Sequence, residues 1–202
     1  MTTSKPVHCR GRGTGSWRPT QGGGTEDSSN NPVSLPLMFE PRFTICFCVS
    51  GNDVLLLRRI KPPYEGKWNG LGGKIEPGET PRASVHREVL EEAGLDLRGA
   101  DLRYAGVVTW VLKGTSEPAG GMFVYVARFP TPPPDEDRDS PEGQLSWKPL
   151  DWAWSRENEE TAEIIPLYLQ DLLTSVNPRE YRLHDEDGRL ELRTLPSDFE
   201  EK

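Results

Sequence analysis

The sequence predicts a single domain of the α/β class. Segments rich in β-branched and aromatic residues recur along the chain, as is typical of strands, and two further segments have the apolar spacing of helices. The length of 202 residues is enough for one domain with a sizeable core. The expected strands cover residues 42–49, 54–59, 102–112, 122–129 and 144–150, and the expected helices cover residues 81–93 and 162–173.

The helix expected at residues 81–93 has clear start and stop signals. Thr80 can serve as its N-cap, Pro81 lies in the first turn, where a missing N–H has no cost, and Gly94 can end the helix. At about 100° per residue, one face carries three carboxylates and the roughly opposite face packs on a sheet. The carboxylates belong to Glu88, Glu91 and Glu92, and the packing face comprises Ala83, His86, Val89, Leu90 and Ala93.

The three carboxylates indicate a site for a hard divalent cation. Like charges held within a few Å of one another repel, and Mg²⁺ or Mn²⁺ relieves that repulsion through carboxylate oxygens. Glu79, just before the helix, can add a fourth carboxylate, and Arg87 on the flank can pair with Glu79 and orient it. The alternative is an ordinary amphipathic helix with a solvated acidic face.

The spacing of these residues resembles the Nudix box, and all seven of its invariant positions are met. With average residue usage, such a match arises by chance at on the order of 10⁻⁸ per start site. The matching positions are Gly73, Glu79, Arg87, Glu88, Glu91, Glu92 and Gly94, with Val89 and Leu95 at the aliphatic positions.

This resemblance implies an α/β/α sandwich with a mixed sheet, and metal-dependent hydrolysis of nucleoside diphosphates linked to another group. It implies that Glu88, Glu91 and Glu92 are metal ligands, together with the carbonyl of Gly73, and that the metal is Mg²⁺ or Mn²⁺. Glu88, or an acid on another loop such as Glu142, would then act as the general base. Arg87 and Glu79 complete the expected catalytic set.

The flanking stretch from Gly66 to Thr80 resembles the MutT-like diphosphatases of 8-oxo-dGTP and other purine nucleotides. That resemblance gives Asn69 a role in reading the base, although Asn69 also suits a simple turn. Arg58, with Arg59 and Lys61 beside it, is a candidate for contacting phosphate, or else a solvated strand end. Lys74 is a further substrate-binding candidate, and Trp154 either stacks on the base or packs in the core.

The residues are compatible with two other functions. The same fold could act on ADP-ribose, a dinucleoside polyphosphate or a nucleotide sugar. The chain could also be a catalytically silent domain that binds nucleotide or protein, although the intact box argues against this. A predicted hairpin at residues 180–195, turning at Asp187-Gly188, favours the MutT-like subgroup, because a similar hairpin closes those enzymes.

Charge and composition restrict the partners. A net charge of −8 argues against a nucleic-acid polymer or an anionic membrane as a partner, whereas a bound metal would still let nucleotide phosphates approach.

Cys9, Cys46 and Cys48 give an odd count of cysteines. We therefore expect Cys46 and Cys48 to be small core residues in a reducing cytoplasm, with a metal-binding CxC pair as the alternative. The expected assembly is a monomer or a homodimer.

The predicted domain covers residues 37–195. Residues 1–36 are rich in Gly, Ser, Thr, Asn and Pro and lack apolar periodicity, so we expect a disordered tail. Residues 196–202 are expected to form an acidic tail. There is no run of about 18 apolar residues and no apolar core of a secretory signal, and we therefore expect a soluble, cytoplasmic protein.

Overall fold

The computed structural model describes residues 39–130, 137–186, 189–197 and 199. The expected N-terminal tail, Cys9, the Asp187-Gly188 turn and most of the expected C-terminal tail lie outside these residues. Among the described residues, no helix is long and apolar enough to cross a membrane.

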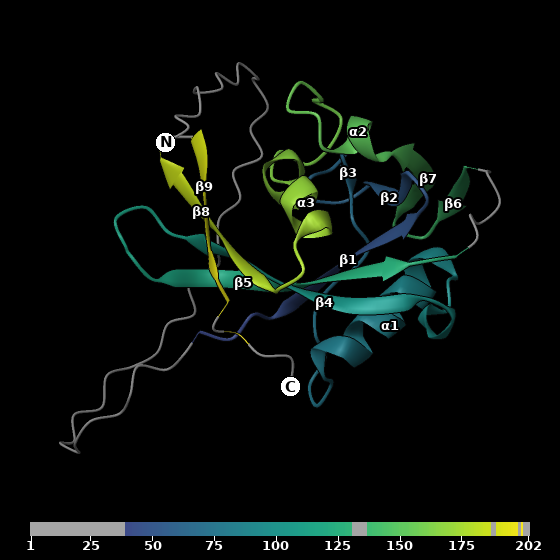
Figure 1. The fold of residues 1–202 in the computed structure, drawn as a ribbon, viewed down its shortest axis with the longest axis horizontal. Helices are drawn as coiled ribbons and strands as arrows, with labels where there is room; N and C mark the ends of the chain where they lie inside the picture. Colours follow the sequence, from purple (N-terminus) through teal and green to yellow (C-terminus); the bar gives the residue numbers. More distant parts are fainter. Residues whose placement is uncertain (1–38, 131–136, 187–188, 198, 200–202) are drawn as a thin grey trace.

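One mixed sheet of nine strands organises the described chain (Figure 1). Its order is β6-β7-β2-β1-β5-β4-β8-β9, with β3 paired to β2 outside that path. The pairs β1/β5 and β4/β8 are parallel, and the other neighbours are antiparallel. The strands are β1 (Phe43–Ser50), β2 (Asp53–Arg59), β3 (Trp68–Asn69), β4 (Asp101–Val111), β5 (Pro118–Arg128), β6 (Arg138–Ser140), β7 (Gly143–Pro149), β8 (Arg179–Glu186) and β9 (Arg189–Pro196).

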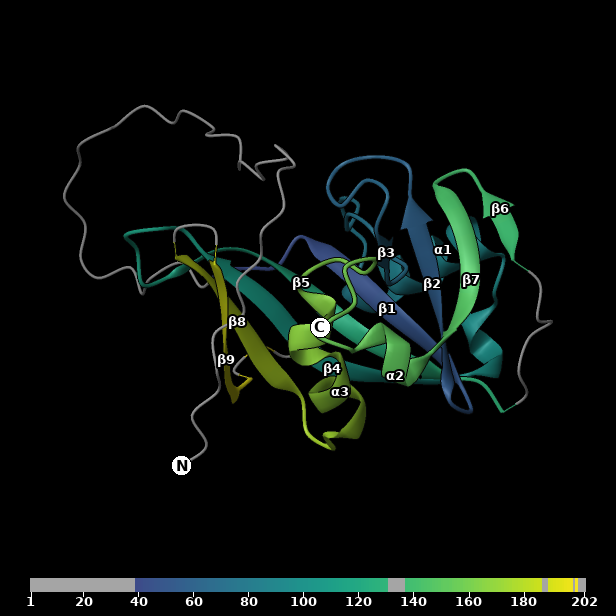
Figure 2. The ribbon, with the colours of Figure 1, turned by 90° about the horizontal axis from the view of Figure 1, so that it is seen from above.

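Helices cover both faces of this sheet, as the two orthogonal views show (Figures 1 and 2). Helix α1 (Pro81–Ala93) and the 3₁₀ turn η1 (Leu97–Gly99) lie on one face, whereas α2 (Leu150–Ala153) and α3 (Ile165–Thr174) lie on the other. Each face has its own buried apolar cluster. The expected α/β/α sandwich with a mixed sheet is therefore confirmed.

The ends of α1 are those that the sequence predicts. Thr80 is extended, and its side chain accepts a hydrogen bond from the backbone N–H of Ala83 at 3.2 Å. Gly94 has φ 61°, and its N–H donates to the carbonyl of Leu90 at 2.9 Å. Both caps satisfy backbone groups that a helix leaves unpaired at its ends.

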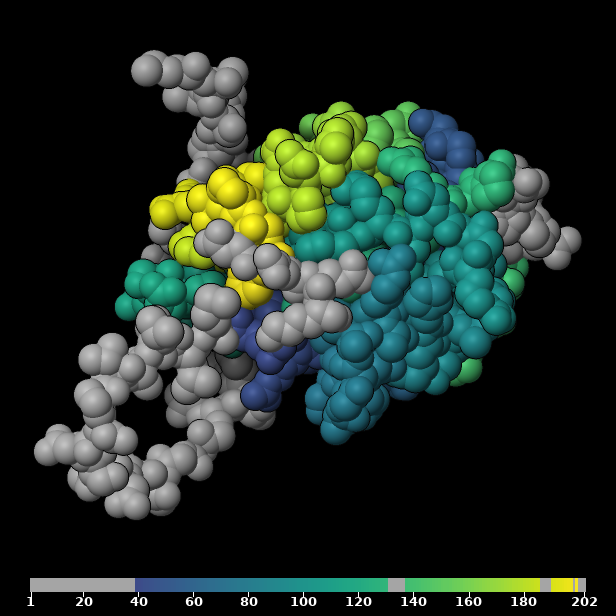
Figure 3. Space-filling view, turned by 60° about the horizontal axis from the view of Figure 1, so that its bottom comes forward, coloured from purple at the N-terminus to yellow at the C-terminus, as the bar shows by residue number. Residues whose placement is uncertain are grey.

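The expected packing face of α1 is partly wrong. Ala83 is exposed and Leu90 is 55% exposed, although Val89 and Ala93 are buried as expected. The buried face is instead centred on Val85, Val89 and Glu92, because the helix is rotated about its axis relative to the prediction. Figure 3 shows the outward side of α1, in blue to teal, on the surface of the molecule.

The short elements were missed and two boundaries shifted. No local pattern in the sequence predicted β3, β6 or α2, because these elements are only two, three and four residues long and depend on neighbours in the fold. Strand β5 begins four residues before its expected start, and α3 begins three residues after its own. The core stripe of α3 is confirmed, since Ile165, Leu169, Leu172 and Leu173 are all buried.

Cys46 and Cys48 are free and fully buried beneath α1, with their Sγ atoms 4.0 Å apart. The hydrogen bond with the Cys48 thiol and burial both raise the pKa of Cys46, so Cys46 stays a neutral thiol in the core. The prediction that they are small core residues is confirmed.

Candidate active site

The loop before α1 runs along the first strand of the sheet. The N–H of Cys46 donates to the carbonyl of Leu71 at 2.6 Å, and the N–H of Thr44 donates to the carbonyl of Gly73 at 2.8 Å. These contacts hold the Gly-rich loop between β1 and the acidic side of α1. The sheet therefore sets the position of the loop relative to the helix.

Two glycines allow this loop to approach its neighbours closely. At Gly72, φ is 146°, and a Cβ atom would lie 2.3 Å from the backbone oxygen of Thr44. At Gly73, a Cβ atom would lie 2.5 Å from a carboxylate oxygen of Glu88. Any side chain at either position would collide with the backbone of β1 or with the acidic cluster.

Arg87 is the centre of the charged network. It donates two hydrogen bonds to Glu79, from Nε and Nη2, each at 2.9 Å, and this is the pairing that the sequence predicts. Its Nη1 also donates to Glu88 at 2.8 Å and to Glu91 at 3.2 Å, and Nη2 donates to the carbonyl of Lys74 at 3.1 Å. The hydrogen bonds from Arg87 lower the pKa of Glu79, and the carboxylates raise the pKa of Arg87 in return.

Glu92 is the buried member of the cluster, at 7% exposure. Burial raises its pKa to about 7, and the nearby charge of Glu88 acts in the same direction. The N–H of Gly72, which donates to Glu92 Oε2 at 2.8 Å, and the charge of Arg59 oppose that rise. Burial therefore disfavours the ionised form of Glu92 more than the nearby positive charge and the Gly72 N–H favour it.

The donor set fits a hard divalent cation in its chemistry. Three carboxylates lie on one side of one helix, and the carbonyl of Gly73 keeps a second lone pair after accepting from Thr44. In the described part of the chain, no three His, Cys, Asp or Glu side chains are close enough together to hold a metal. The reason is visible in the contacts: Glu88 and Glu91 turn towards Arg87, whereas Glu92 turns towards Gly72.

The four substrate-binding candidates lie at different places around this site. Asn69 is half-buried on β3, and its Oδ1 accepts from the N–H of Gly70 at 3.0 Å, as a turn residue would. Arg58 is exposed at the end of β2, and Lys74 is exposed in the loop that Arg87 holds. Trp154 is half-buried and packs against the core under α3.

Several residues on the α3 side were not identified from the sequence. The Nζ atom of Lys148 lies 4.6 Å from the ring centre of Trp68 and 5.8 Å from that of Trp152. Tyr64, Trp110 and Met122 are half-buried against the same core. The available signal was the alternation on β7, which places Lys148 on the face of the sheet opposite to α1.

Glu142, the candidate base from another loop, is held by an ion pair. Its carboxylate lies 2.8 Å from Nζ of Lys61, and its carbonyl accepts from the N–H of Ile60 at 3.2 Å. The charge of Glu142 also raises the pKa of Glu92, which places Glu142 near the acidic helix. His86 and His184, the two histidines among the described residues, have no assigned catalytic role.

Comparison with known proteins agrees with this architecture. Residues 38–168 match the NUDIX domain family. An uncharacterized Nudix hydrolase of Bacillus subtilis is 36% identical over 108 residues, which is 52% of this chain and 64% of that protein. A putative 8-oxo-dGTP diphosphatase 2 of Mycobacterium tuberculosis is 47% identical over 55 residues, which is 27% of this chain and 38% of that protein.

The crystal structure of a MutT protein from Bacillus halodurans aligns with a TM-score of 0.57 and 26% identity, over 76% of this chain and 96% of that one. A mixed sheet between helices, with a Gly-rich loop leading into a carboxylate-bearing helix, defines the Nudix class of fold. This chain belongs to the NUDIX domain family. It spans less than two thirds of the length of the two curated relatives described above.

Proposed function

We propose that this protein is a Mg²⁺-dependent Nudix pyrophosphohydrolase that cleaves the diphosphate linkage of purine nucleoside di- or triphosphates, oxidised or not. The observation that carries the proposal is that Glu88, Glu91 and Glu92 lie on one side of α1. The loop at Gly72 and Gly73 lies directly against this side of the helix. The names of the relatives support the choice of an oxidised purine nucleotide as the first substrate to test.

Glu88, Glu91 and Glu92, with the carbonyl of Gly73, would hold Mg²⁺ or Mn²⁺. When bound, the cation polarises the diphosphate and lowers the pKa of the attacking water. Arg87 donates hydrogen bonds to Glu79 and to the carbonyl of Lys74, and these bonds fix the position of the loop relative to α1. Glu88 or Glu142 accepts the proton of the water.

The bond changes are those of a hydrolysis. The oxygen of water bonds to one phosphorus, the bond from that phosphorus to the bridging oxygen breaks, and the proton leaves through the general base. A triphosphate yields the monophosphate and diphosphate, and a diphosphate yields the monophosphate and phosphate.

The base would lie on the α3 side of the sheet. Asn69 offers both a donor and an acceptor to a base edge, and the half-buried aromatic residues there offer stacking surfaces. Trp154, Trp152, Tyr64 and Trp110 are the candidates for stacking. Arg58 would contact the substrate near its phosphates.

The rival proposals are a hydrolase with another diphosphate-linked substrate and a silent binding domain. The test is a substrate panel at neutral pH: 8-oxo-dGTP, dGTP, dATP, ADP-ribose, a diadenosine polyphosphate and a sugar nucleotide, compared by kcat/KM. An advantage of roughly 100-fold for 8-oxo-dGTP, about 2.7 kcal/mol of transition-state discrimination, supports a base-reading pocket.

Metal removal and two neutral variants test the chemistry itself. We expect EDTA to abolish hydrolysis and added Mg²⁺ or Mn²⁺ to restore it. Glu91→Gln and Glu92→Gln should each lower kcat/KM by at least about 100-fold, because a neutral amide is a poor ligand for a hard cation. Asp101→Asn, on the exposed end of β4, is the matched control and should retain activity. Parent-like rates in both Gln variants would rule out the metal-site assignment.

The remaining parts of the proposal concern the whole protein. A small-molecule nucleotide is the proposed partner, without a nucleic-acid polymer or a membrane, and the cytoplasm is the proposed location. A monomer or homodimer is the proposed assembly. The proposed domain covers residues 37–195.

A further inference from the structure

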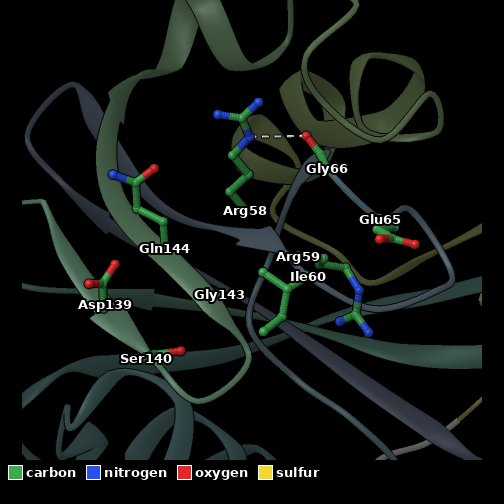
Figure 4. A pocket seen from close by; sticks show the side chains of 9 residues that line it. All are labelled: Arg58, Arg59, Ile60, Glu65, Gly66, Asp139, Ser140, Gly143 and Gln144. Carbon is green, nitrogen blue, oxygen red and sulfur yellow. Dashed lines mark hydrogen bonds between the residues drawn. The ribbon is translucent and has the colours of Figure 1, made fainter.

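The order of the sheet ends on β6 at one side and on β9 at the other, and these two edge strands differ. Strand β6 is three residues long, and its Asp139 and Ser140 are seen in Figure 4. Strand β9 runs for eight residues as the outer strand of the β8/β9 hairpin (Figure 2). Within the described ranges, the backbone hydrogen bonds of β9 go to β8 alone. One side of β9 therefore presents a row of unpaired N–H and C=O groups.

Strand β9 has little of the protection that proteins usually give to an edge. Edge strands are commonly kept very short, bent by a bulge, interrupted by proline or lined with lysine. The register of β9 with β8 runs without a shift, so it contains no bulge, and its one proline, Pro196, is its last residue. Because proline has no N–H, Pro196 ends the stretch that can pair. The β9 edge, residues 189–195, is therefore a straight and continuous surface for another strand.

Two charged side chains on the β9 edge have no partner in the described part of the chain. Glu191 and Arg193 alternate with Leu192, which packs against the α3-side core, so both charges project from the opposite face of the sheet. Neither side chain makes a hydrogen bond or ion pair with a described residue. Arg182, which lies opposite Arg193 on β8, pairs with Glu180 instead. The charges of the β9 edge are thus left for a neighbour outside the chain.

A second copy of β9 complements these charges. When two identical strands pair antiparallel about a two-fold axis, one residue lies opposite its own copy. With Leu192 at that position, Glu191 of each copy lies opposite Arg193 of the other. Residues 189–195 of both copies are then paired along their whole length. Opposite charges that face each other across neighbouring strands stabilise the pair.

Other positions of the axis are less favourable. With Glu191 on the axis, two carboxylates would face each other, and with Arg193 on the axis, two guanidinium groups would do so. Like charges directly opposite in a sheet are destabilising. With the axis at Leu190 or Thr194, the paired stretch shrinks from residues 189–195 to residues 189–191 or 192–196. Charge and length therefore both select the register centred on Leu192.

We propose that the β9 edge binds the β9 edge of a second copy of this chain, so that two sheets join into one across a two-fold axis at Leu192. The Leu192 side chains of the two copies meet beside the α3-side core. A single pair of strands is at the small end of protein interfaces, so the dimer is weak, with a Kd in the micromolar range. This inference is independent of the proposed function, because the β9 edge contains none of the site residues assigned above.

Charge reversal tests the pairing in the full-length protein. Sedimentation velocity from about 1 to 300 µM should show the parent passing from monomer to dimer. Glu191→Arg and Arg193→Glu each bring like charges together across the axis and should weaken association at least tenfold. The double variant restores opposite charges and should associate like the parent, and so should an equimolar mixture of the two single variants. Glu65→Arg, in the exposed loop after β2, is the control and should change nothing (Figure 4).

A cysteine on the axis tests the register. Directly opposite residues have Cα atoms about 4.5–5.5 Å apart, a separation that a disulfide can span. Leu192→Cys, made with Cys9→Ser, should therefore form a disulfide-linked dimer under mild oxidation. Leu190→Cys in the same background is the control, because its own copy lies about 13 Å away in the proposed register. Cys46 and Cys48 are buried and should not contribute.

Each possible result decides the proposal. Association that is lost in the single variants and recovered in the double variant and in the mixture supports it. A parent protein that stays monomeric over the whole concentration range overturns it. A dimer of equal strength in the parent and in the single variants also overturns it, as does a failure of both the double variant and the mixture to recover association. Disulfide formation as rapid at position 190 as at position 192 overturns the register.

Discussion

Replacing Gly73 by alanine should remove activity without unfolding the protein. The added Cβ would lie 2.5 Å from Oε1 of Glu88, 2.7 Å from its Cδ and 2.8 Å from its Oε2. Ordinary contacts to a Cβ begin near 3.4 Å, so the carboxylate has to move by about 1 Å. The obstacle is the end of a flexible side chain, which can rotate away.

The two consequences of this movement differ in size. A misplacement of about 1 Å in a reacting site can lower the rate by roughly 100-fold, or about 2.7 kcal/mol in the barrier. The free energy of unfolding should change by no more than about 1 kcal/mol, because alanine also restricts the unfolded chain. Gly73→Ala should therefore have a melting temperature within about 4 °C of the parent.

Gly72→Ala is the contrasting variant for the same assays. Its Cβ would lie 2.3 Å from the backbone oxygen of Thr44, and φ at this position is 146°. Neither strain is relieved by a side-chain rotation, so we expect a loss of about 3 kcal/mol or more in stability. Thermal unfolding and kcat/KM with Mg²⁺ should separate the two variants. Near-parental kcat/KM in Gly73→Ala would refute the view that activity needs the space next to Gly73 for the Glu88 carboxylate.

Two further predictions concern the ion pair and the core. Glu79→Gln removes the charge from the two 2.9 Å hydrogen bonds donated by Arg87, and should lower the free energy of unfolding by about 1–2 kcal/mol at pH 7. Because Arg87 lowers the pKa of Glu79 in the folded protein, this stability difference should be present above the ordinary glutamate pKa and vanish as the pH falls through the lowered pKa of folded Glu79. Urea unfolding of both proteins at several pH values measures the difference. A difference that persists in acid would contradict the pairing. Leu169→Ala, at a fully buried position of α3, should lower stability by about 3 kcal/mol and the melting temperature by roughly 6–12 °C, with kcat at 25 °C retained; a smaller shift in calorimetry would show that the core around α3 collapses into the space.

The sequence predicted the parts of the fold that depend on local signals. The helix at residues 81–93, with its caps at Thr80 and Gly94, and the longer strands follow from capping chemistry and apolar spacing, which act within a few residues. The partnership of Arg87 with Glu79 was also predictable, because a loop residue just before a helix can reach a side chain two turns along it. The box spacing was enough to indicate the family.

Other features depend on contacts between segments far apart in the chain. The rotation of α1 that exposes Leu90 goes with the packing of Val85, Val89 and Ala93 on the sheet. It also buries Glu92, which accepts a hydrogen bond from the Gly72 N–H of a segment 20 residues away. Short strands such as β3 and β6 form only because longer neighbours pair with them.

By itself, then, the sequence determined the acidic helix, its caps and the family to which the chain belongs. Only the tertiary structure decided which carboxylate is buried, and only it paired Asp139 with Gln144 and Gln144 with Arg58 across neighbouring strands. The physical reason is that a pattern read along the chain reports forces between near neighbours, whereas burial and strand register are set by segments that meet only in the folded protein.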